Sequence, residues 1–113
     1  MREPVRDRER LLHILEAIKI IENSRVKYTS AEQVNDPIIY YGFVKHVEII
    51  GEAVFMLSKE FKEAHPEVEW DAIEGMRHVL VHGYYQIDPD QLWETIDKDI
   101  PLLKLQIESL LYA

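Results

Sequence analysis

Apolar residues recur at intervals of three and four along the first part of the chain, from about Asp7 to Ser24. These positions are Leu11, Ile14, Leu15, Ile18 and Ile21. Such spacing is typical of an α-helix that buries a single stripe of side chains. The segment from Lys27 to Ala31 breaks this pattern. We therefore expect a connector after the first helix.

The pair Asp36-Pro37 predicts the start of a second helix. An aspartate side chain can accept the free amide hydrogens of the first turn, and proline fits the first helical position. We expect this helix to end near Lys59. Its apolar residues cover more than one stripe, which predicts one surface for the core and another for a partner helix or a second protomer. Gly51 lowers helix stability at mid-helix and so indicates close approach by another helix.

The sequence next predicts a turn over residues 60–66, ended by a proline, and then a third helix. This helix should begin near Glu69 to Asp71 and end around His82 to Tyr85, where Gly83 supplies a stop. The residues expected to enter the core are Ile73, Met76, Val79 and Leu80.

A last helix is predicted from Asp88-Pro89, which repeats the aspartate-proline start. Its inward positions are Leu92, Trp93, Ile96, Ile100, Leu103, Ile107 and Leu110. Pro101 should kink it. Four helices with short connectors and no strand pattern predict an all-α fold. We expect residues 1–113 to form a single domain, an antiparallel up-and-down four-helix bundle with a kinked C-terminal helix.

Composition narrows the class of protein. The chain has 113 residues, of which 47% are apolar and 30% charged, an ordinary balance for one globular domain that is marginal without a partner. It contains no cysteine, which excludes disulfides, a thiolate nucleophile and cysteine-based zinc sites. The charged N-terminus precedes no apolar run of signal or membrane length. We expect a cytoplasmic protein without membrane association.

The net charge of −8 argues against broad, charge-driven binding of nucleic acid. Seven of the thirteen Lys and Arg residues lie in the first 27 positions, whereas the last 48 positions hold three against ten acidic residues. Any RNA groove should then be small and local, bordered by the first helix. The acidity would also suit docking onto a basic partner.

Residues 75–85 combine an arginine, two histidines and two tyrosines with an apolar run. The guanidinium of Arg77 suits phosphate oxygens, and a histidine can move protons near neutral pH. This pairing suits phosphodiester chemistry without a metal. On one ideal helix Arg77 and His82 would lie roughly 140° apart, so we hypothesise that two copies of the helix share one cleft in a symmetric dimer. Glu52 is the carboxylate expected near Arg77.

Other interpretations of these residues remain open. Arg77 could form a structural ion pair with Glu52 or Glu74, while the histidines bind carbonyls at the helix end. His78 and His82 stand one helical turn apart and could in principle bind a metal. We nevertheless expect neither a metal nor a cofactor.

The residues Arg77, His82 and Tyr84 reproduce the R-x4-H-x-Y signature of HepT-like toxins in the HEPN superfamily of helical ribonucleases. Other segments agree in order with this family: Ile50-Gly51-Glu52-Ala53, Pro66-Glu67-Val68-Glu69-Trp70, Met76-Arg77-His78, Leu92-Trp93-Glu94-Thr95 and Asp99-Ile100-Pro101. The chain resembles the family almost throughout, from about Arg10 onward. One departure is His78, because these toxins often carry asparagine directly after the arginine.

The resemblance implies the same helical fold and a function. Arg77 and His82 would be the catalytic residues of a metal-independent endoribonuclease that leaves a 2′,3′-cyclic phosphate, with His78, Glu52 and Tyr84 supporting the site. The protein would be the toxin of a type VII-like toxin–antitoxin pair. Its MntA-like nucleotidyltransferase antitoxin would neutralise it by AMPylation of Tyr84. The alternative is a catalytically silent helical dimer that binds a nucleotidyltransferase partner or a nucleotide.

Overall fold

The computed structural model describes residues 2–81 and 87–112, and no strand occurs among them. The elements in chain order are the helices α1 (Arg2–Arg25), α2 (Pro37–Met56), α3 (Lys59–Ala64), α4 (Trp70–Leu80) and α5 (Pro89–Glu94), the π-helical turn η1 (Thr95–Asp99) and the helix α6 (Ile100–Tyr112).

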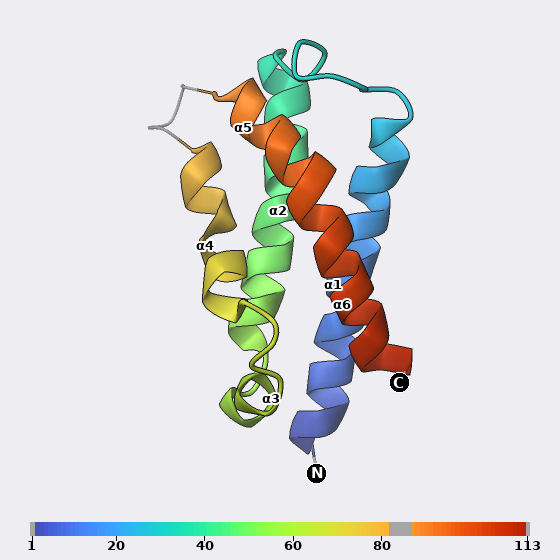
Figure 1. Ribbon diagram of the computed structural model, residues 1–113, viewed down its shortest axis with the longest axis vertical. Helices are drawn as coiled ribbons and strands as arrows, with labels where there is room; N and C mark the ends of the chain where they lie inside the picture. The colour runs from blue at the N-terminus through green and yellow to red at the C-terminus, as the bar shows by residue number, and fades with distance from the viewer. Residues whose placement is uncertain (1, 82–86, 113) are drawn as a thin grey trace.

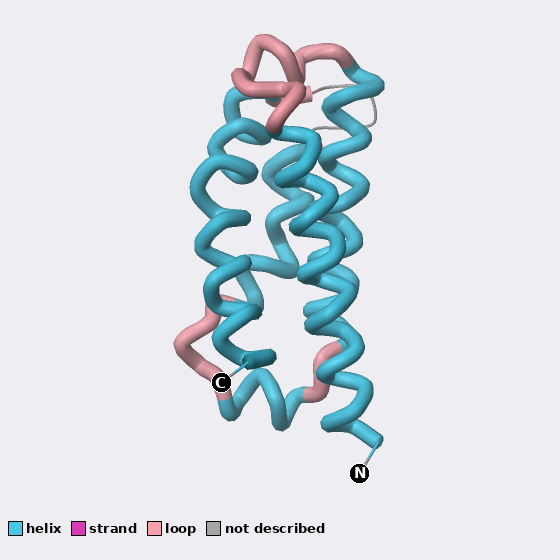
Figure 2. The backbone as a smooth tube through the Cα atoms, turned by 90° about the vertical axis from the view of Figure 1, so that its right-hand side faces the viewer, coloured by secondary structure: helices cyan, strands magenta, loops and turns pink. Residues whose placement is uncertain are grey.

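The long helices form an up-and-down bundle (Figure 1). α1 and α4 run in one direction, and α2 and the continuous segment α5–η1–α6 run in the other (Figure 1). α2 packs against both α1 and α4, and α6 closes the bundle over α1. The second view shows the connectors at the two ends of the bundle (Figure 2). The predicted all-α bundle is confirmed.

The core consists of the stripes that the apolar spacing predicts. All five predicted apolar positions of α1, from Leu11 to Ile21, are buried. α2 contributes Phe43, Val44, Val47, Ile50 and Val54, and the last helix contributes Leu92, Ile96, Ile100, Leu103 and Ile107. Some apolar residues of α2 stay outside, since Ile38 and Phe55 are 82% and 70% exposed. These two residues lie at opposite ends of α2, and the second packing surface predicted for this helix stays a prediction.

Both predicted aspartate caps are present. The side chain of Asp36 accepts a hydrogen bond of 2.8 Å from the backbone N–H of Ile38. The side chain of Asp88 accepts one of 3.1 Å from the N–H of Gln91. Each aspartate satisfies one of the free amides at a helix start.

The segment between α2 and α4 differs from the prediction. α2 ends at Met56, three residues before Lys59, and the predicted turn over residues 60–66 contains the short helix α3. Ser58 begins this helix, because its Oγ accepts a hydrogen bond of 3.1 Å from the N–H of Phe61. The buried carboxylate of Asp7, in α1, accepts hydrogen bonds from the N–H and the Oγ of Ser58 at 2.8 and 2.7 Å. This tertiary contact was not predictable from local sequence.

The irregularity expected at Pro101 takes the form of a π-helical turn. η1 ends at Asp99, two residues before the proline, and the N–H of Ile100 bonds the carbonyl of Thr95. Proline has no N–H and so cannot donate the hydrogen bond that an α-helix requires at its position. The wider π-helical turn directly before Pro101 accommodates this missing hydrogen bond. α5, η1 and α6 therefore continue one another as the fourth helical segment.

Candidate functional site between α2 and α4

The site depends on how closely α4 approaches α2. Gly51 faces the backbone of α4, where a Cβ atom at this position would lie 3.4 Å from the carbonyl oxygen of Glu74. The close approach that Gly51 predicted is confirmed. This contact sets the register of α4 against α2.

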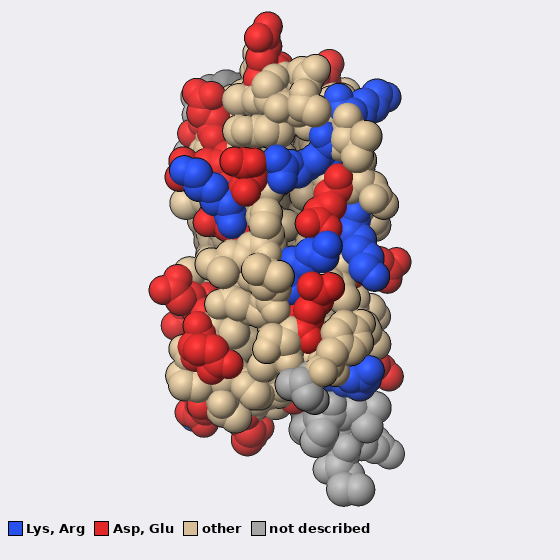
Figure 3. Space-filling view, turned by 45° about the vertical axis from the view of Figure 1, so that its right-hand side comes forward, with Lys and Arg blue, Asp and Glu red and all other residues tan. Residues whose placement is uncertain are grey.

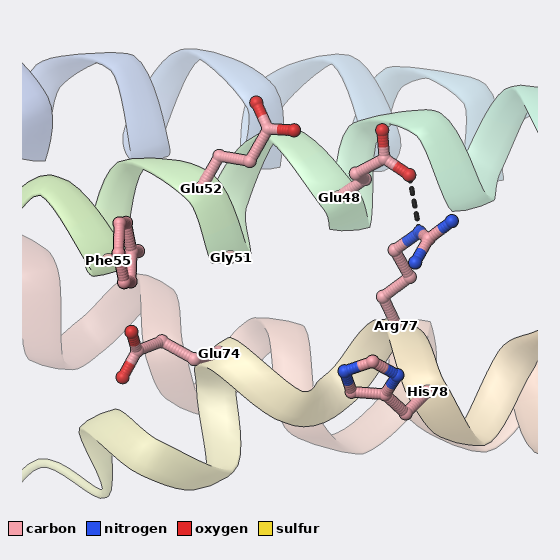
Figure 4. A pocket seen from close by; sticks show the side chains of 7 residues that line it. All are labelled: Glu48, Gly51, Glu52, Phe55, Glu74, Arg77 and His78. Carbon is pink, nitrogen blue, oxygen red and sulfur yellow. Dashed lines mark ion pairs between the residues drawn. The ribbon is translucent and has the colours of Figure 1, made fainter.

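A hollow of about 450 Å³ opens between these two helices (Figure 4). It is lined by Glu48, Gly51, Glu52, Phe55, Glu74, Arg77 and His78. Arg77 and His78 come from the last turn of α4, and the residues from 48 to 55 come from α2. The structure thus brings Arg77, His78 and Glu52, three of the predicted site residues, to one surface.

Arg77 reaches across the hollow to α2. Its Nε lies 2.5 Å from Oε2 of Glu48, and the two side chains are 45% and 26% exposed. A guanidinium carries five N–H donors in a planar fork. A contact through Nε therefore leaves donors for a second anion, such as a phosphate.

The carboxylate that pairs with Arg77 is Glu48, which the sequence analysis did not single out. Glu52 lines the same hollow, but its carboxylate points away from Arg77 (Figure 4). Glu48 stands one helical turn before Glu52 on the same face of α2. The i, i+4 spacing of the two glutamates was the available signal, and the register of α2 against α4 decides between them.

The predicted end of α4 is wrong by at least two residues. The helix ends at Leu80 and Val81 takes an extended conformation, with φ −114° and ψ 106°. Val79, expected in the core, is 47% exposed, while Ile73 and Leu80 are buried as predicted. His82, Gly83, Tyr84 and Tyr85 lie outside the described residues. The angle of roughly 140° between Arg77 and His82 assumed one continuous helix and no longer applies.

The hollow is negatively charged as a whole. Three carboxylates, Glu48, Glu52 and Glu74, face one guanidinium, and Phe55 forms an exposed apolar wall. A polyanion would therefore meet repulsion as well as the attraction of Arg77. The site can hold a phosphate only locally, at the guanidinium.

The basic residues of α1 do not border this hollow, contrary to the expectation. α1 and α4 lie on opposite sides of α2 (Figure 1). On the face that includes α1 and α6, basic side chains alternate with acidic ones (Figure 3). Two are paired there, Arg25 with Asp97 at 2.7 Å and Lys104 with Glu22 at 2.9 Å. The visible face carries no continuous basic surface for nucleic acid.

No helix within residues 2–81 and 87–112 is long and apolar enough to cross a membrane. Over the same residues, no group of three or more His, Asp or Glu side chains stands close enough to hold a metal ion.

The bundle and the arginine at the end of α4 define a class, small helical proteins with an exposed arginine in a hollow between two helices. The family model "Ribonuclease HepT-like" matches residues 14–110. The chain therefore belongs to the HepT-like family of HEPN-type ribonucleases.

Several relatives have names that agree with this family. The chain is 45% identical over 102 residues to "Putative RNase TTE0752" of Caldanaerobacter subterraneus subsp. tengcongensis, covering 89% of this chain and 90% of that protein. It is 36% identical over 97 residues to "Probable ribonuclease HepT" of Thermococcus cleftensis, covering 86% and 88%. It is 34% identical over 109 residues to "Putative RNase MJ1216" of Methanocaldococcus jannaschii, covering 96% and 90%. No solved structure matches the chain significantly.

Proposed function

We propose that this protein is a metal-independent endoribonuclease in which Arg77 and His82 are catalytic. Membership of the HepT-like family supports the reaction class. The structural observation that carries the proposal is the placement of Arg77. Its half-exposed guanidinium stands in an open hollow beside His78 and is oriented by Glu48.

The reaction needs a proton acceptor, a proton donor and a cation. His82 acts as general base on the ribose 2′-hydroxyl or as general acid toward the leaving 5′-oxygen. The 2′-oxygen attacks phosphorus, the bond from phosphorus to the 5′-oxygen breaks, and the product is a 2′,3′-cyclic phosphate. Arg77 stabilises the negative charge that develops on the phosphate oxygens. His78, which lines the same hollow as Arg77, or His82 of the other protomer supplies the complementary acid or base.

The test is cleavage of single-stranded RNA by purified protein, freed of any antitoxin, in the presence of a chelator. We expect cleavage with 2′,3′-cyclic phosphate ends, and its loss in Arg77→Ala and in His82→Ala. Matched controls are Arg25→Ala, whose guanidinium pairs with Asp97 instead, and His13→Ala on the exposed side of α1. Wild-type rates in Arg77→Ala and His82→Ala would contradict the proposal.

A second part of the proposal is that two protomers share each site. The exposed Phe55 on the wall of the hollow supports this arrangement, because a second copy would cover it. The two inactive variants can be mixed as a test. If Arg77 of one protomer acts with His82 of the other, each mixed dimer regains one intact site, and free exchange restores about a quarter of wild-type activity. No recovery after confirmed exchange would exclude this arrangement.

We further propose that the protein is a toxin whose MntA-like nucleotidyltransferase antitoxin AMPylates Tyr84. Tyr84 follows His82 by two positions in the R-x4-H-x-Y pattern. A nucleotide phosphate added near Arg77 would occupy the guanidinium and repel RNA. Intact mass after co-expression should show added AMP on wild type and on Tyr112→Phe, an exposed control tyrosine. It should show none on Tyr84→Phe, and equal addition to that variant would contradict the assignment.

One observation favours the alternative of a catalytically silent helical dimer. The hollow holds three carboxylates and one guanidinium, already paired with Glu48. A silent protein would bind its nucleotidyltransferase partner or a nucleotide equally well with or without Arg77 and His82. Growth arrest on expression, relieved by His82→Ala, separates the two functions because only the nuclease requires that imidazole.

A further inference from the structure

A buried phenol joins α2 to the end of α4, the helix that carries Arg77. Tyr40 lies in the first turns of α2, and none of its surface is exposed. Its hydroxyl donates a hydrogen bond to the carbonyl oxygen of Leu80, the last residue of α4.

The acceptor is a backbone group at a helix end. The last carbonyls of a helix receive no hydrogen bond from within it, and a buried carbonyl without a donor is costly. Leu80 is fully buried, and its carbonyl takes its donor from Tyr40 rather than from α4. The position of α4 relative to α2 is thereby set at the turn that also carries Arg77.

The chemistry of Tyr40 suits a permanent link. Burial raises the pKa of its phenol, and the backbone of Asp88 offsets this only in part. The raised pKa favours the protonated hydroxyl, which is the form that donates to Leu80. The ring of Tyr41 packs edge-on against Tyr40, with centroids 5.3 Å apart, which restricts the phenol further.

We propose that Tyr40 is a positioning residue of the nuclease, because its hydroxyl holds the end of α4, in the same turn as Arg77, against α2. This inference rests on the proposed function. Tyr40 itself does not touch substrate. Its effect should appear in the chemical step, since small displacements of catalytic groups lower rates strongly while leaving substrate binding intact.

The test compares Tyr40→Phe with Tyr28→Phe in the RNA cleavage assay. Tyr40→Phe keeps the buried ring and removes only the hydroxyl. We expect kcat to fall at least about 10-fold with KM within about twofold. Tyr28 is a half-buried tyrosine that packs edge-on against Phe43, and its variant should keep the wild-type kcat. A kcat for Tyr40→Phe equal to that of the control would overturn the inference.

Hydrogen exchange separates local positioning from general loss of stability. In Tyr40→Phe the amide of Val81, which donates to the carbonyl of Arg77 at the end of α4, should exchange at least about 10-fold faster, because this helix end loses its hydrogen bond to α2. The amide of Ile18, in the middle of α1, should exchange at the wild-type rate. Equal acceleration at both amides would mean that Tyr40 only stabilises the fold, which would also overturn the inference.

Arg77→Ala in the same assay keeps the two proposals apart. If Arg77→Ala is inactive while Tyr40→Phe retains its kcat, the nuclease stands and only the positioning role fails. If Arg77→Ala cleaves RNA at the wild-type rate, the proposed function fails and the role of Tyr40 falls with it.

Discussion

The ion pair between Glu48 and Arg77 is the contact on which the candidate site depends most directly. Glu48→Gln tests it with little change in shape, because glutamine keeps an oxygen acceptor and loses the charge. We expect the variant to weaken both the bundle and the proposed reaction. The two effects have separate magnitudes and separate assays.

The stability effect follows from distance and exposure. Two unit charges about 4 Å apart attract by about 4 kcal/mol at an effective dielectric constant of 20, but desolvation and side-chain entropy offset most of this. Exposed pairs contribute roughly 0.2–1 kcal/mol. The pair here is close, at 2.5 Å, and its carboxylate is only 26% exposed. We therefore expect a coupling energy near the upper end, about 1 kcal/mol.

A double-mutant cycle of Glu48→Gln and Arg77→Met measures that coupling by urea unfolding at one protein concentration. The coupling should shrink by roughly half in 1 M NaCl, where the Debye length is about 3 Å. Lys45 provides a control, because its Nζ lies 3.6 Å from Oε1 of the same glutamate and its side chain is 63% exposed. A cycle of Glu48→Gln with Lys45→Met should give a coupling of at most about 0.3 kcal/mol.

The kinetic effect shows whether Glu48 orients the guanidinium of Arg77 for phosphate or competes with phosphate for it. If Glu48 orients the guanidinium for phosphate, Glu48→Gln should lower kcat several-fold, about 5-fold, with a small fall in KM because one repelling carboxylate is gone. A rise in kcat would refute this reasoning. It would mean that Glu48 occupies the guanidinium at the expense of the substrate. A coupling near zero would refute the structural part independently.

Three other predictions concern the bundle. Asp7→Ala leaves the N–H and Oγ of Ser58 without their buried acceptor, and urea unfolding should show a loss of about 2 kcal/mol; a loss below about 0.5 kcal/mol would contradict the role of this contact. Gly51→Ala places a Cβ at ordinary contact distance, 3.4 Å, from the carbonyl of Glu74, so the helix-propensity gain of up to about 0.8 kcal/mol should raise the melting temperature. A lower melting temperature would show that α4 is displaced. Burial raises the pKa of Asp99, so its ionised form opposes folding. Asp99→Asn should therefore raise the free energy of unfolding at pH 7 by about 0.3 kcal/mol, a small gain because the side chain is exposed. The gain should vanish as the pH falls through that raised pKa toward 3.8. A gain that persists in acid would contradict this cause.

The parts of the fold that the sequence predicted are those decided within one helix. The stripe of α1 depends on spacing within the helix, and each aspartate cap depends on a carboxylate two or three residues before the N–H that donates to it. The misplaced residues depend on neighbouring helices. Val79 continues the apolar spacing of α4, yet it lies at the rim of a groove against α6, together with Leu102. Spacing identifies the apolar stripe of a helix, whereas packing against neighbouring helices determines which residues of that stripe are exposed.

The candidate site likewise depends on packing between helices that the spacing within one helix does not predict. Charged residues are common on helix surfaces, so no local rule separates Glu48 from Glu52 as the partner of Arg77. The choice follows from the register of α2 and α4, which the contact between Gly51 and Glu74 sets. That glycine signalled a close approach, but it could not say which turn would face the arginine. A single residue can thus predict an interface without predicting the pairs that form across it.

The end of α4 changes what the spacing of the signature means. Within a continuous helix, five positions would fix the angle between Arg77 and His82, and that angle was the geometric reason to invoke a second protomer. The helix ends at Leu80, so Arg77 lies in its last turn and the angle drawn from one continuous helix no longer applies. The position of Arg77 depends on the contacts that hold the end of α4, among which is the hydrogen bond from the hydroxyl of Tyr40 to Leu80. The case for a shared site therefore rests on the exposed wall of the hollow and on the mixing of inactive variants, and no longer on helix geometry.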